Sequence, residues 1–323
     1  MGQTRGTGPG KERTEDMDRR EDGAVRLAAL DRGLRVLPAE LAGPVLALGR
    51  QALIQAEELR LRRGRPVAVN LAGTERETAG PPVTEEDLRT VVENASQASA
   101  HTVLDQVRNG FVTLRGGHRL GLCGTVARQG ERIITLRYLT SLALRLACPA
   151  AGQAGQVLDA LRTPEGVAST LILAPPGVGK TTLLRELVRR LSEGEGGPPL
   201  RVGLADERGE VAALWQGEAQ LDVGRHTDVL DGCGKAEGLL LLLRGMNPQV
   251  LAADEITQPE DAAAMEEAAG CGVALLATAH AAGVEDLRRR PVYRALLARR
   301  VFQKAVVLER RGSQRLARVE ALV

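Results

Sequence analysis

Short apolar runs recur through the second half of the chain, and a segment with helical spacing follows most of them. Runs that are apolar at every position suit the strands of a parallel sheet, which is buried on both faces. Strands that alternate with helices in this way predict an α/β domain. The strands that we expect are 170–174, 201–206, 249–254, 272–279 and 304–308, and a last alternating strand in RLARVEALV.

The first half has a mixed pattern. Segment 26–62 is rich in Leu and Ala with helical spacing and ends in the basic run LRLRRGR, and residues 66–71 then alternate as a strand does. Thr84 followed by Asp87 predicts a capping box that opens a helix to about residue 108. Three short strand-like pieces follow, with a Gly-Gly hairpin turn at 116–117 between the first two. These pieces are 111–114, 119–123 and 133–136.

These patterns divide the chain into three parts. Residues 1–22 lack apolar periodicity and carry both charge signs, which predicts a disordered tail and argues against a signal peptide. We expect a mixed α/β N-terminal domain over 23–149 and the larger α/β domain over 150–323.

Composition narrows the class of protein. The chain is 43% hydrophobic and 26% charged with a net charge of +2, as in many soluble proteins, and only 2% of its residues are aromatic. Near-neutral charge and few stacking platforms argue against a nucleic-acid partner. The apolar stretches 239–243 and 273–279 are too short to cross a membrane, so we expect no direct insertion. Cys123, Cys148, Cys233 and Cys271 have no zinc spacing, which favours reduced cysteines in a cytosolic protein.

The segment after the strand at 170–174 has the residues of a phosphate-binding loop. The chain reads APPGVGKT and continues into a helical run. Such a loop points backbone N–H groups at phosphates, and Gly177 and Gly179 keep side chains out of the way. Lys180 supplies a point charge, the Thr181 hydroxyl is a ligand for Mg²⁺, and the helix N-terminus adds partial positive charge. The predicted nucleotide-binding residues are Pro175, Pro176, Gly177, Val178, Gly179, Lys180, Thr181 and Thr182.

Ala174 departs from the motif, which has glycine at its first position. An alanine can turn there if its φ stays negative, so we expect slightly altered loop geometry and retained binding. The alternative is a glycine-rich turn with an incidental Lys-Thr, but strand, loop and helix all fall where the motif requires them. No guanine-reading motif is evident, so ATP is the expected nucleotide.

Acidic residues follow the strand expected at 249–254. In an open parallel sheet, ligands bind beyond the carboxyl ends of the strands, so the polar residues there are candidates for the site. Asp254 is predicted to hold the metal ion and Glu255 to act as general base or to position water, as in a Walker B element. The alternative is an acidic cap on a helix N-terminus.

Two other expected strands end in polar residues. Asp206 and Glu207 follow one of them, and we take Glu207 as a catalytic candidate that would assist with metal or water. A surface charge cluster is the alternative. Thr278 and His280 end another, where a polar side chain can sense the γ-phosphate by hydrogen bonding. We take His280 as a catalytic candidate, and a histidine that caps a helix is the alternative.

The polar, glycine-rich segment 223–237 precedes a very apolar helical run, GLLLLLRGM. A loop of this length in a compact domain is more often functional than idle. Arg225 is a catalytic candidate that would reach phosphate in its own subunit or in a neighbour. An exposed, solvated arginine is the alternative.

Several strings together resemble one family. The strings APPGVGKTTLLREL, ADERGEVA, VGRHTDVLDGCGKAEG, LLRGMNPQVLAADEI and LLATAH are similar in order and wording to the stage III sporulation protein AA family. Earlier segments agree, namely EELRLRRGRPVAV, NGFVTLRGGHRLGLCG and TLRYLTSLALRLA. The resemblance covers roughly residues 25–310. The departures are Ala174, Gly234 where proline is expected, and the stretch YLTSLAL, which is usually more polar.

The resemblance implies a secretion-type ATPase with a RecA-like P-loop domain, which would bind ATP and Mg²⁺ and assemble as a homo-oligomer, expected to be a hexamer. It implies a cytoplasmic mother-cell protein of endospore-forming bacteria, peripheral to the membrane. Its partners would be the membrane proteins of the channel complex between mother cell and forespore. In such ATPases the nucleotide lies between two domains and near a neighbouring subunit, which makes Arg119, Arg137 and Arg145 candidates for closing over phosphate.

Three functions remain open from the sequence. The leading one is an ATPase that converts hydrolysis into domain motion for a channel assembly. The second is a nucleotide-regulated scaffold with little turnover, which Ala174 favours. The third is a RecA-like nucleic-acid motor, for which the basic stretch 60–65 is the only support besides the core fold. A small-molecule kinase fits less well, because no lid or acceptor-site sequence is recognisable.

Overall fold

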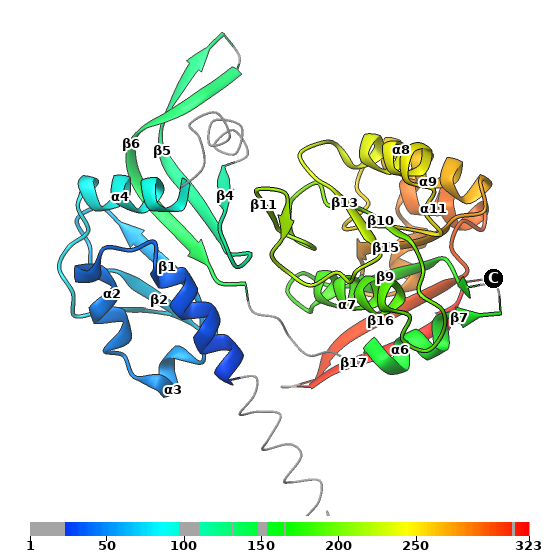
Figure 1. Ribbon diagram of the computed structural model, residues 1–323, viewed down its shortest axis with the longest axis horizontal. Coiled ribbons are helices and arrows are strands. Elements are labelled where there is room, and N and C mark those ends of the chain that lie inside the picture. The colour runs from blue at the N-terminus through cyan, green and yellow to red at the C-terminus, as the bar shows by residue number, and fades with distance from the viewer. Residues whose placement is uncertain are drawn as a thin grey trace, which may run out of the picture. The chain divides into compact units, whose positions relative to one another are not determined.

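The computed structural model describes residues 23–96, 110–130, 132–147, 154–164, 166–311 and 314–322. Contacts between Cα atoms divide the chain into two compact units, Met1–Ala150 and Ala151–Val323 (Figure 1). The predicted tail at 1–22, the predicted helix beyond residue 96 and Cys148 lie outside the described residues. No helix in the described ranges is both long and apolar enough to cross a bilayer.

The first unit is built on an antiparallel sheet. In its described part, six strands are hydrogen-bonded in the order β3-β2-β1-β6-β5-β4. Their bounds are β1 (Ala56–Arg62), β2 (Ala68–Leu71), β3 (Thr74–Glu77), β4 (Phe111–Thr113), β5 (Arg119–Gln129) and β6 (Arg132–Arg145). The helical residues 23–34 and helices α2 (Ala39–Leu46), α3 (Arg50–Leu53) and α4 (Glu85–Ser96) share one apolar core with the strands.

Strand β1 corrects the expectation of helical structure throughout 26–62. The first part of that segment is helical, but residues 56–62 form a strand between β2 and β6. Leu59 and Leu61 are fully buried at 0% exposure and alternate with the half-buried Arg60 and Arg62. The sheet buries one face of β1, so every second side chain of this segment lies in the core. Residues 56–62 therefore form a strand, although the helical spacing of the residues before them continues into this segment.

Two local predictions in this unit are confirmed. The Thr84 amide donates to Asp87 Oδ2 (2.8 Å) and the Asp87 amide donates to Thr84 Oγ1 (3.1 Å), which is the reciprocal capping box at the start of α4. Strands β4 and β5 form an antiparallel hairpin. Its turn contains Gly116 and Gly117 at φ 88° and 79°, a conformation that favours glycine.

The second unit contains a mainly parallel sheet. Within its described residues the order is β13-β10-β14-β15-β9-β16-β17, and only the β16–β17 pair is antiparallel. The strands are β9 (Thr170–Ala174), β10 (Val202–Ala205), β13 (Thr227–Leu230), β14 (Val250–Ala253), β15 (Ala274–His280), β16 (Lys304–Arg311) and β17 (Gln314–Ala321). Two short pairs lie outside it, β7 (Arg162–Thr163) with β8 (Gly166–Val167) and β11 (Leu214–Trp215) with β12 (Glu218–Ala219).

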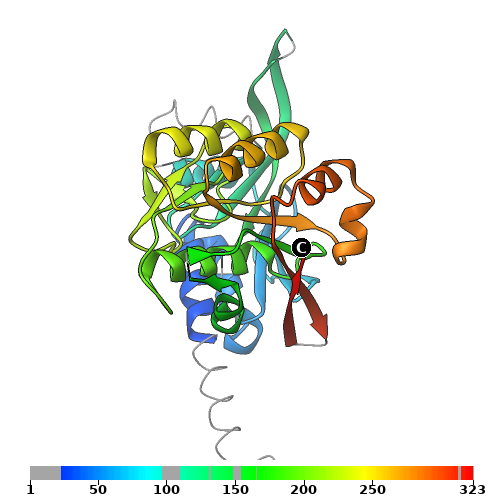
Figure 2. The ribbon, with the colours of Figure 1, turned by 90° about the vertical axis from the view of Figure 1, so that its right-hand side faces the viewer.

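Helices cover both faces of this sheet (Figures 1 and 2). Ile172 and Ala174 of β9 belong to the core cluster that includes buried residues of α6 and α7, whereas Leu171 and Leu173 belong to the opposite cluster with α8 to α11. Alternate residues of one strand therefore serve both cores, which explains the continuous apolar runs. The helices are α6 (Ala154–Leu161), α7 (Lys180–Glu193), α8 (Lys235–Met246), α9 (Pro259–Gly270), α10 (Val284–Arg288) and α11 (Pro291–Ala298).

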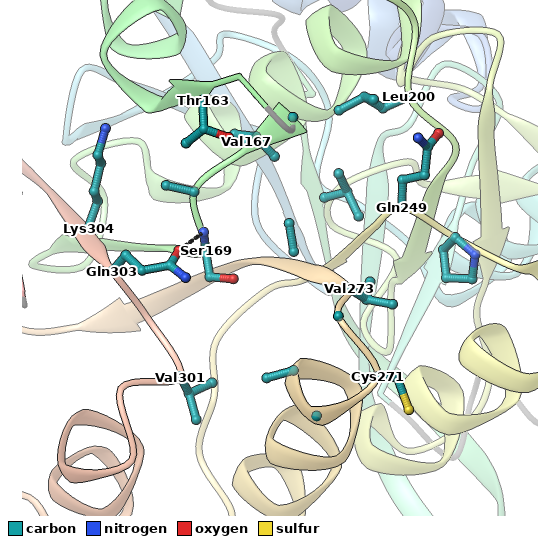
Figure 3. A pocket seen from close by; sticks show the side chains of 18 of the residues that line it. Thr163, Val167, Ser169, Leu200, Gln249, Cys271, Val273, Val301, Gln303 and Lys304 are labelled. Carbon is teal, nitrogen blue, oxygen red and sulfur yellow. Dashed lines mark hydrogen bonds between the residues drawn. The ribbon is translucent and has the colours of Figure 1, made fainter.

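A hollow of about 1010 Å³ opens where strands of this sheet begin (Figure 3). Ser169, Gln249 and Val273, which precede β9, β14 and β15, are among its lining residues, and the Ser169 amide donates to Gln303 (2.6 Å). None of the residues predicted to bind nucleotide lines it. The hollow lies at the opposite edge of the sheet from the phosphate-binding loop, because parallel strands begin at one edge and end at the other.

His118 generates a prediction about the first unit. Its side chain is fully buried, its Nδ1 accepts a hydrogen bond from the Ala147 amide (3.0 Å), and burial, with Arg32 adding to the effect, lowers its pKa from 6.5 to about 4. As the pH falls through this window, the unfolded chain binds a proton that folded His118 does not bind, so stability falls. We expect the first unit to lose up to about 3 kcal/mol more than a His118→Asn variant between pH 6.5 and 4.

Hydrogen exchange of peptides from the first unit, measured across this pH range, gives its unfolding free energy in both proteins. Asparagine is the control because its side-chain carbonyl can accept the Ala147 hydrogen bond and does not titrate. The same pH dependence in both proteins would contradict the assignment.

Candidate nucleotide-binding site

The strand order of the second unit brings three chain segments together. Strand β15 pairs in parallel with β14 on one side and β9 on the other, so all three end at the same edge of the sheet. The phosphate-binding loop follows β9, the acidic pair follows β14, and Thr278 and His280 lie at the end of β15. Side chains that are about 100 residues apart in the sequence therefore meet at one place.

The loop after β9 has the backbone that the motif predicts. Gly177 and Gly179 have φ values of 75° and 112°, which suit glycine, and Gly179 is the N-cap of α7. No side chain caps this helix, so amides of its first turn can bind an anion. Ala174 is not among the residues with positive φ, as expected, and is fully buried at the end of β9. Of the other predicted residues, Pro175 and Pro176 are exposed, Val178 packs on the core, and Thr182 is half-buried.

Lys180 lies folded against its own loop. Its side chain is only 6% exposed, and Nζ donates to the carbonyl oxygens of Ala174 (3.0 Å) and Pro175 (3.3 Å). The Nζ atom also lies 2.8 Å from His280 Nδ1. Burial lowers the pKa of Lys180, while Asp254 and Glu255 act in the opposite direction. The ammonium group therefore has protein partners that a phosphate could replace.

A carboxylate and two hydroxyls form the centre of the site. Thr181 Oγ1 donates to Asp254 Oδ2 (2.6 Å), and Thr278 Oγ1 donates to Asp254 Oδ1 (2.5 Å). These are hard oxygen donors of the kind that Mg²⁺ prefers. Among the described residues, no group of three or more His, Cys, Asp and Glu could hold a metal on its own. The Asp254 carboxylate beside the Thr181 hydroxyl fits an ion such as Mg²⁺, which uses one or two protein ligands together with water and phosphate oxygens.

Glu255 lies next to this centre in an unusual backbone conformation. Its φ is 55°, a left-handed value that is uncommon for residues other than glycine. Its amide donates to Thr278 Oγ1 (2.9 Å), and its carboxylate contacts His280 Nε2 and Arg208 (3.0 Å). An ammonium group can only donate, so Lys180 makes His280 Nδ1 the acceptor and leaves the hydrogen on Nε2, which donates to Glu255. Lys180, His280, Glu255 and Arg208 thus form a continuous polar chain.

The acidic pair after β10 has a different arrangement. Asp206 is 1% exposed, and its oxygens accept hydrogen bonds from the amides of Glu210, Val211, Ala212 and Ala213. This carboxylate therefore orders the following turn. Glu207 lies 3.2 Å from Lys235 Nζ and is 41% exposed on its side chain. The structure thus connects Glu207 to the site through Lys235, and none of its contacts is with Lys180 or Asp254.

Of the four predicted arginines, only Arg225 belongs to the second unit, and it does not join this cluster. Arg225 pairs with Glu193 (2.8 Å) and has an 80% exposed side chain. Glu193 is the last residue of α7, and Lys180 is the first, so about 20 Å of helix separates them. The first unit holds the other three: Arg119 lies over the Phe111 ring (3.8 Å), Arg145 pairs with Glu58 (3.0 Å), and Arg137 is exposed on β6.

Sequence analysis missed two site residues. The sequence patterns single out neither Arg208, which lies within the string ADERGEVA, nor Lys235. Lys235 is the first residue of α8, where a positive charge opposes the helix dipole. A lysine at the start of a helix is unfavourable unless a specific acceptor binds it, and this feature of the sequence could have indicated a site residue. The acceptor is the Glu255 carbonyl oxygen, 2.6 Å from Lys235 Nζ.

Sequence comparisons match most of this chain to one family. Residues 34–319 match the family model described as "Sporulation stage III, protein AA". The chain is 36% identical over 285 residues to Stage III sporulation protein AA of Bacillus subtilis (strain 168). That match covers 85% of this chain and 89% of the relative, so it includes both units.

Two solved structures are similar to this chain in fold. The ATPase DotB of Legionella pneumophila gives a TM-score of 0.55 at 14% identity, covering 82% of this chain and 76% of that one. The pilus retraction motor PilT with bound ADP gives a TM-score of 0.57 at 16% identity, covering 85% and 81%. At such identities the likeness shows the fold alone. It confirms the expected RecA-like P-loop domain with a mainly parallel sheet, preceded by a smaller mixed α/β domain.

Thr278 provides a test of the site geometry. It is fully buried, and its hydroxyl serves both the Asp254 carboxylate and the Glu255 amide. Thr278→Val keeps the shape but leaves that amide without its partner, so we expect the second unit to lose about 1–3 kcal/mol of unfolding free energy. Urea unfolding followed by the fluorescence of Trp215, the single tryptophan, measures this loss.

Thr278→Ser is the matched control. It keeps the hydroxyl and removes one methyl group, so a loss of about 1 kcal/mol or less is expected. If the serine variant lost as much as the valine variant, the methyl group and not the hydrogen bonds would account for the effect.

Proposed function

This chain belongs to the sporulation stage III protein AA family, and we propose that it is an ATPase that hydrolyses ATP with Mg²⁺ at the site around Lys180. The observation that carries the proposal is the convergence of Lys180, Thr181, Asp254 and Glu255 from the ends of β9 and β14. A glycine-rich turn alone would not require a carboxylate against the Thr181 hydroxyl and a second one linked to Lys180 through His280.

Each group has a role that its position supports. The loop amides and the α7 N-terminus hold the phosphates, and the Lys180 ammonium exchanges the carbonyls of Ala174 and Pro175 for phosphate oxygens. Thr181 and Asp254 would hold Mg²⁺, which when bound neutralises charge on the phosphates. Glu255 orients the attacking water and accepts its proton. His280, between Lys180 and Glu255, is placed to sense the γ-phosphate.

The proposed biological role is supported by family membership and by fold. We propose a homo-oligomer, expected to be a hexamer, in the mother-cell cytoplasm, where it energises or assembles the channel complex between mother cell and forespore. The similar fold of DotB, an ATPase, and of PilT, a retraction motor, supports a motor. Arg225, Arg119, Arg137 and Arg145 remain predictions for phosphate contacts, and an oligomer would let Arg225 act on a neighbouring subunit.

A nucleotide-regulated scaffold with little turnover is the second candidate. Two features of the loop favour it. Ala174 replaces the first glycine of the motif, and the Lys180 ammonium is already hydrogen-bonded to a carbonyl of its own loop. The nucleic-acid motor loses its sequence support in the described structure. Arg60 pairs with Glu58, Arg62 with Glu75 (2.5 Å) and Arg63 with Glu85 (3.0 Å), so this part of the basic stretch is already neutralised.

The proposed activity is tested by phosphate release from ATP. Lys180→Ala should lower turnover at least about 100-fold by removing charge that stabilises the transition state. Glu255→Gln should lower it by about 100- to 10,000-fold while retaining nucleotide binding, because only the base is lost. Equal phosphate release by wild type and Lys180→Ala would reject the site. Tight ATP binding with the same negligible turnover in wild type and Glu255→Gln would favour the scaffold.

Oligomer formation is a separate expectation. In the presence of ATP and Mg²⁺ we expect particles of about six times the 34.3 kDa chain mass, and smaller particles without nucleotide. Mass photometry with and without nucleotide measures this, with Glu255→Gln used to keep ATP bound. A mass that stays at that of one chain under all conditions would contradict the proposed oligomer.

A further inference from the structure

Lys235 is a buried cation in an unfavourable position. It lies near the end of the polar segment 223–237 and is the first residue of α8. Its exposed fraction is 5%. A positive charge at a helix N-terminus is repelled by the helix dipole, and a buried ammonium group needs hydrogen-bond partners. The Lys235 ammonium group therefore needs hydrogen-bond acceptors from other elements of the fold.

Three other segments supply those acceptors. The ammonium donates to the Glu255 main-chain carbonyl (2.6 Å), and it lies near the carboxylates of Glu207 (3.2 Å) and Asp261 (3.8 Å). Asp261 is itself 5% exposed and caps the start of α9 by accepting the amides of Thr257 and Gln258. One side chain thus connects the start of α8 with the chain after β10, the chain after β14 and the start of α9.

The contact of Lys235 with Glu255 affects the direction of the Glu255 carboxylate. Glu255 has a left-handed φ of 55°, which an L-residue keeps only when its surroundings impose it. Thr278 holds the Glu255 amide, Lys235 holds its carbonyl, and the Tyr293 hydroxyl holds the carbonyl of the next residue, Ile256. In this conformation the carboxylate reaches His280 and Arg208. A relaxed φ would turn the same side chain in another direction.

We propose that Lys235 is a positioning residue for ATP hydrolysis, which fixes the left-handed main chain of Glu255 and thereby aims its carboxylate. This inference rests on the proposed function, in which Glu255 is the base. Lys235 makes its contacts with a carbonyl and two carboxylates of the protein and does not touch the phosphate-binding loop. Its loss should therefore lower kcat and leave nucleotide affinity in place.

The chain offers a matched control in Lys304. Its ammonium also donates to a main-chain carbonyl, that of Ala160, in the same unit. Lys304 starts β16, at the edge of the sheet opposite the phosphate-binding loop. Lys235→Met and Lys304→Met thus remove the same kind of contact from two places, of which only one adjoins Glu255.

The experiment compares these variants in the full chain by ATP turnover, by the Kd of a fluorescent ADP analogue, and by hydrogen exchange of the peptide that spans residues 254–258. We expect Lys235→Met to lower kcat at least about tenfold, with Kd within about threefold. Exchange at the Glu255 and Ile256 amides should become faster. Lys304→Met should match wild type in all three. In a Glu255→Gln background, Lys235→Met should cause less than about a twofold further loss, because the base it positions is already gone.

The outcomes separate the inference from the function on which it rests. Normal kcat in Lys235→Met, or the same fold-loss with and without Glu255, overturns the positioning role while the ATPase stands. A wild-type protein without turnover overturns the ATPase and the role of Lys235 with it. Retained ADP binding shows that the variant is folded. If it fails that check, Lys235→Gln, which keeps a donor without the charge, is measured by the same criteria.

Discussion

The hydrogen-bonded contact of Asp254 with Thr181 and Thr278 is the interaction on which the site depends. Thr181 lies in the first turn of α7 after β9, Asp254 follows β14, and Thr278 belongs to β15. The contact exists only because β15 is inserted between the other two strands, with Ala253 opposite Ala277 and Ala174 opposite His280 in register. A shift of one residue in either pairing would turn Thr278 to the other face of the sheet. The register of the parallel strands therefore determines which side chains meet at the site as well as which pack in the core.

Charge compensation explains the arrangement around this contact. Lys180 and Lys235 are both nearly buried, and a buried ammonium without partners is costly. The protein supplies main-chain carbonyls to both, from Ala174 and Pro175 to Lys180 and from Glu255 to Lys235. In the proposed function the two lysines differ in role. Phosphate oxygens can replace the partners of Lys180, whereas the partners of Lys235 are parts of the scaffold that holds Glu255.

The departures from the sequence-based expectations have physical causes. Residues 56–62 continue a helical pattern in sequence, but the sheet places them between two strands, and pairing decides their conformation. Asp206 follows a strand at the correct edge, yet four amides of the next turn take its oxygens, a local arrangement that no spacing indicates. Arg225 lies in the polar segment as expected, but that segment passes the far end of α7, where Glu193 binds it.

The sequence by itself determined the parts whose cause is local. Continuous apolar runs predicted the buried strands, Thr84 and Asp87 predicted the cap of α4, and the glycines around Lys180 predicted the turn between β9 and α7. The tertiary structure decided which side chains meet. The order of the strands placed His280 between Lys180 and Glu255, and the packing of α8 against the sheet placed Lys235 within hydrogen-bond distance of the Glu255 carbonyl. These contacts join residues 20 to 100 positions apart, and hydrophobic periodicity specifies which face of an element is buried without specifying its neighbour.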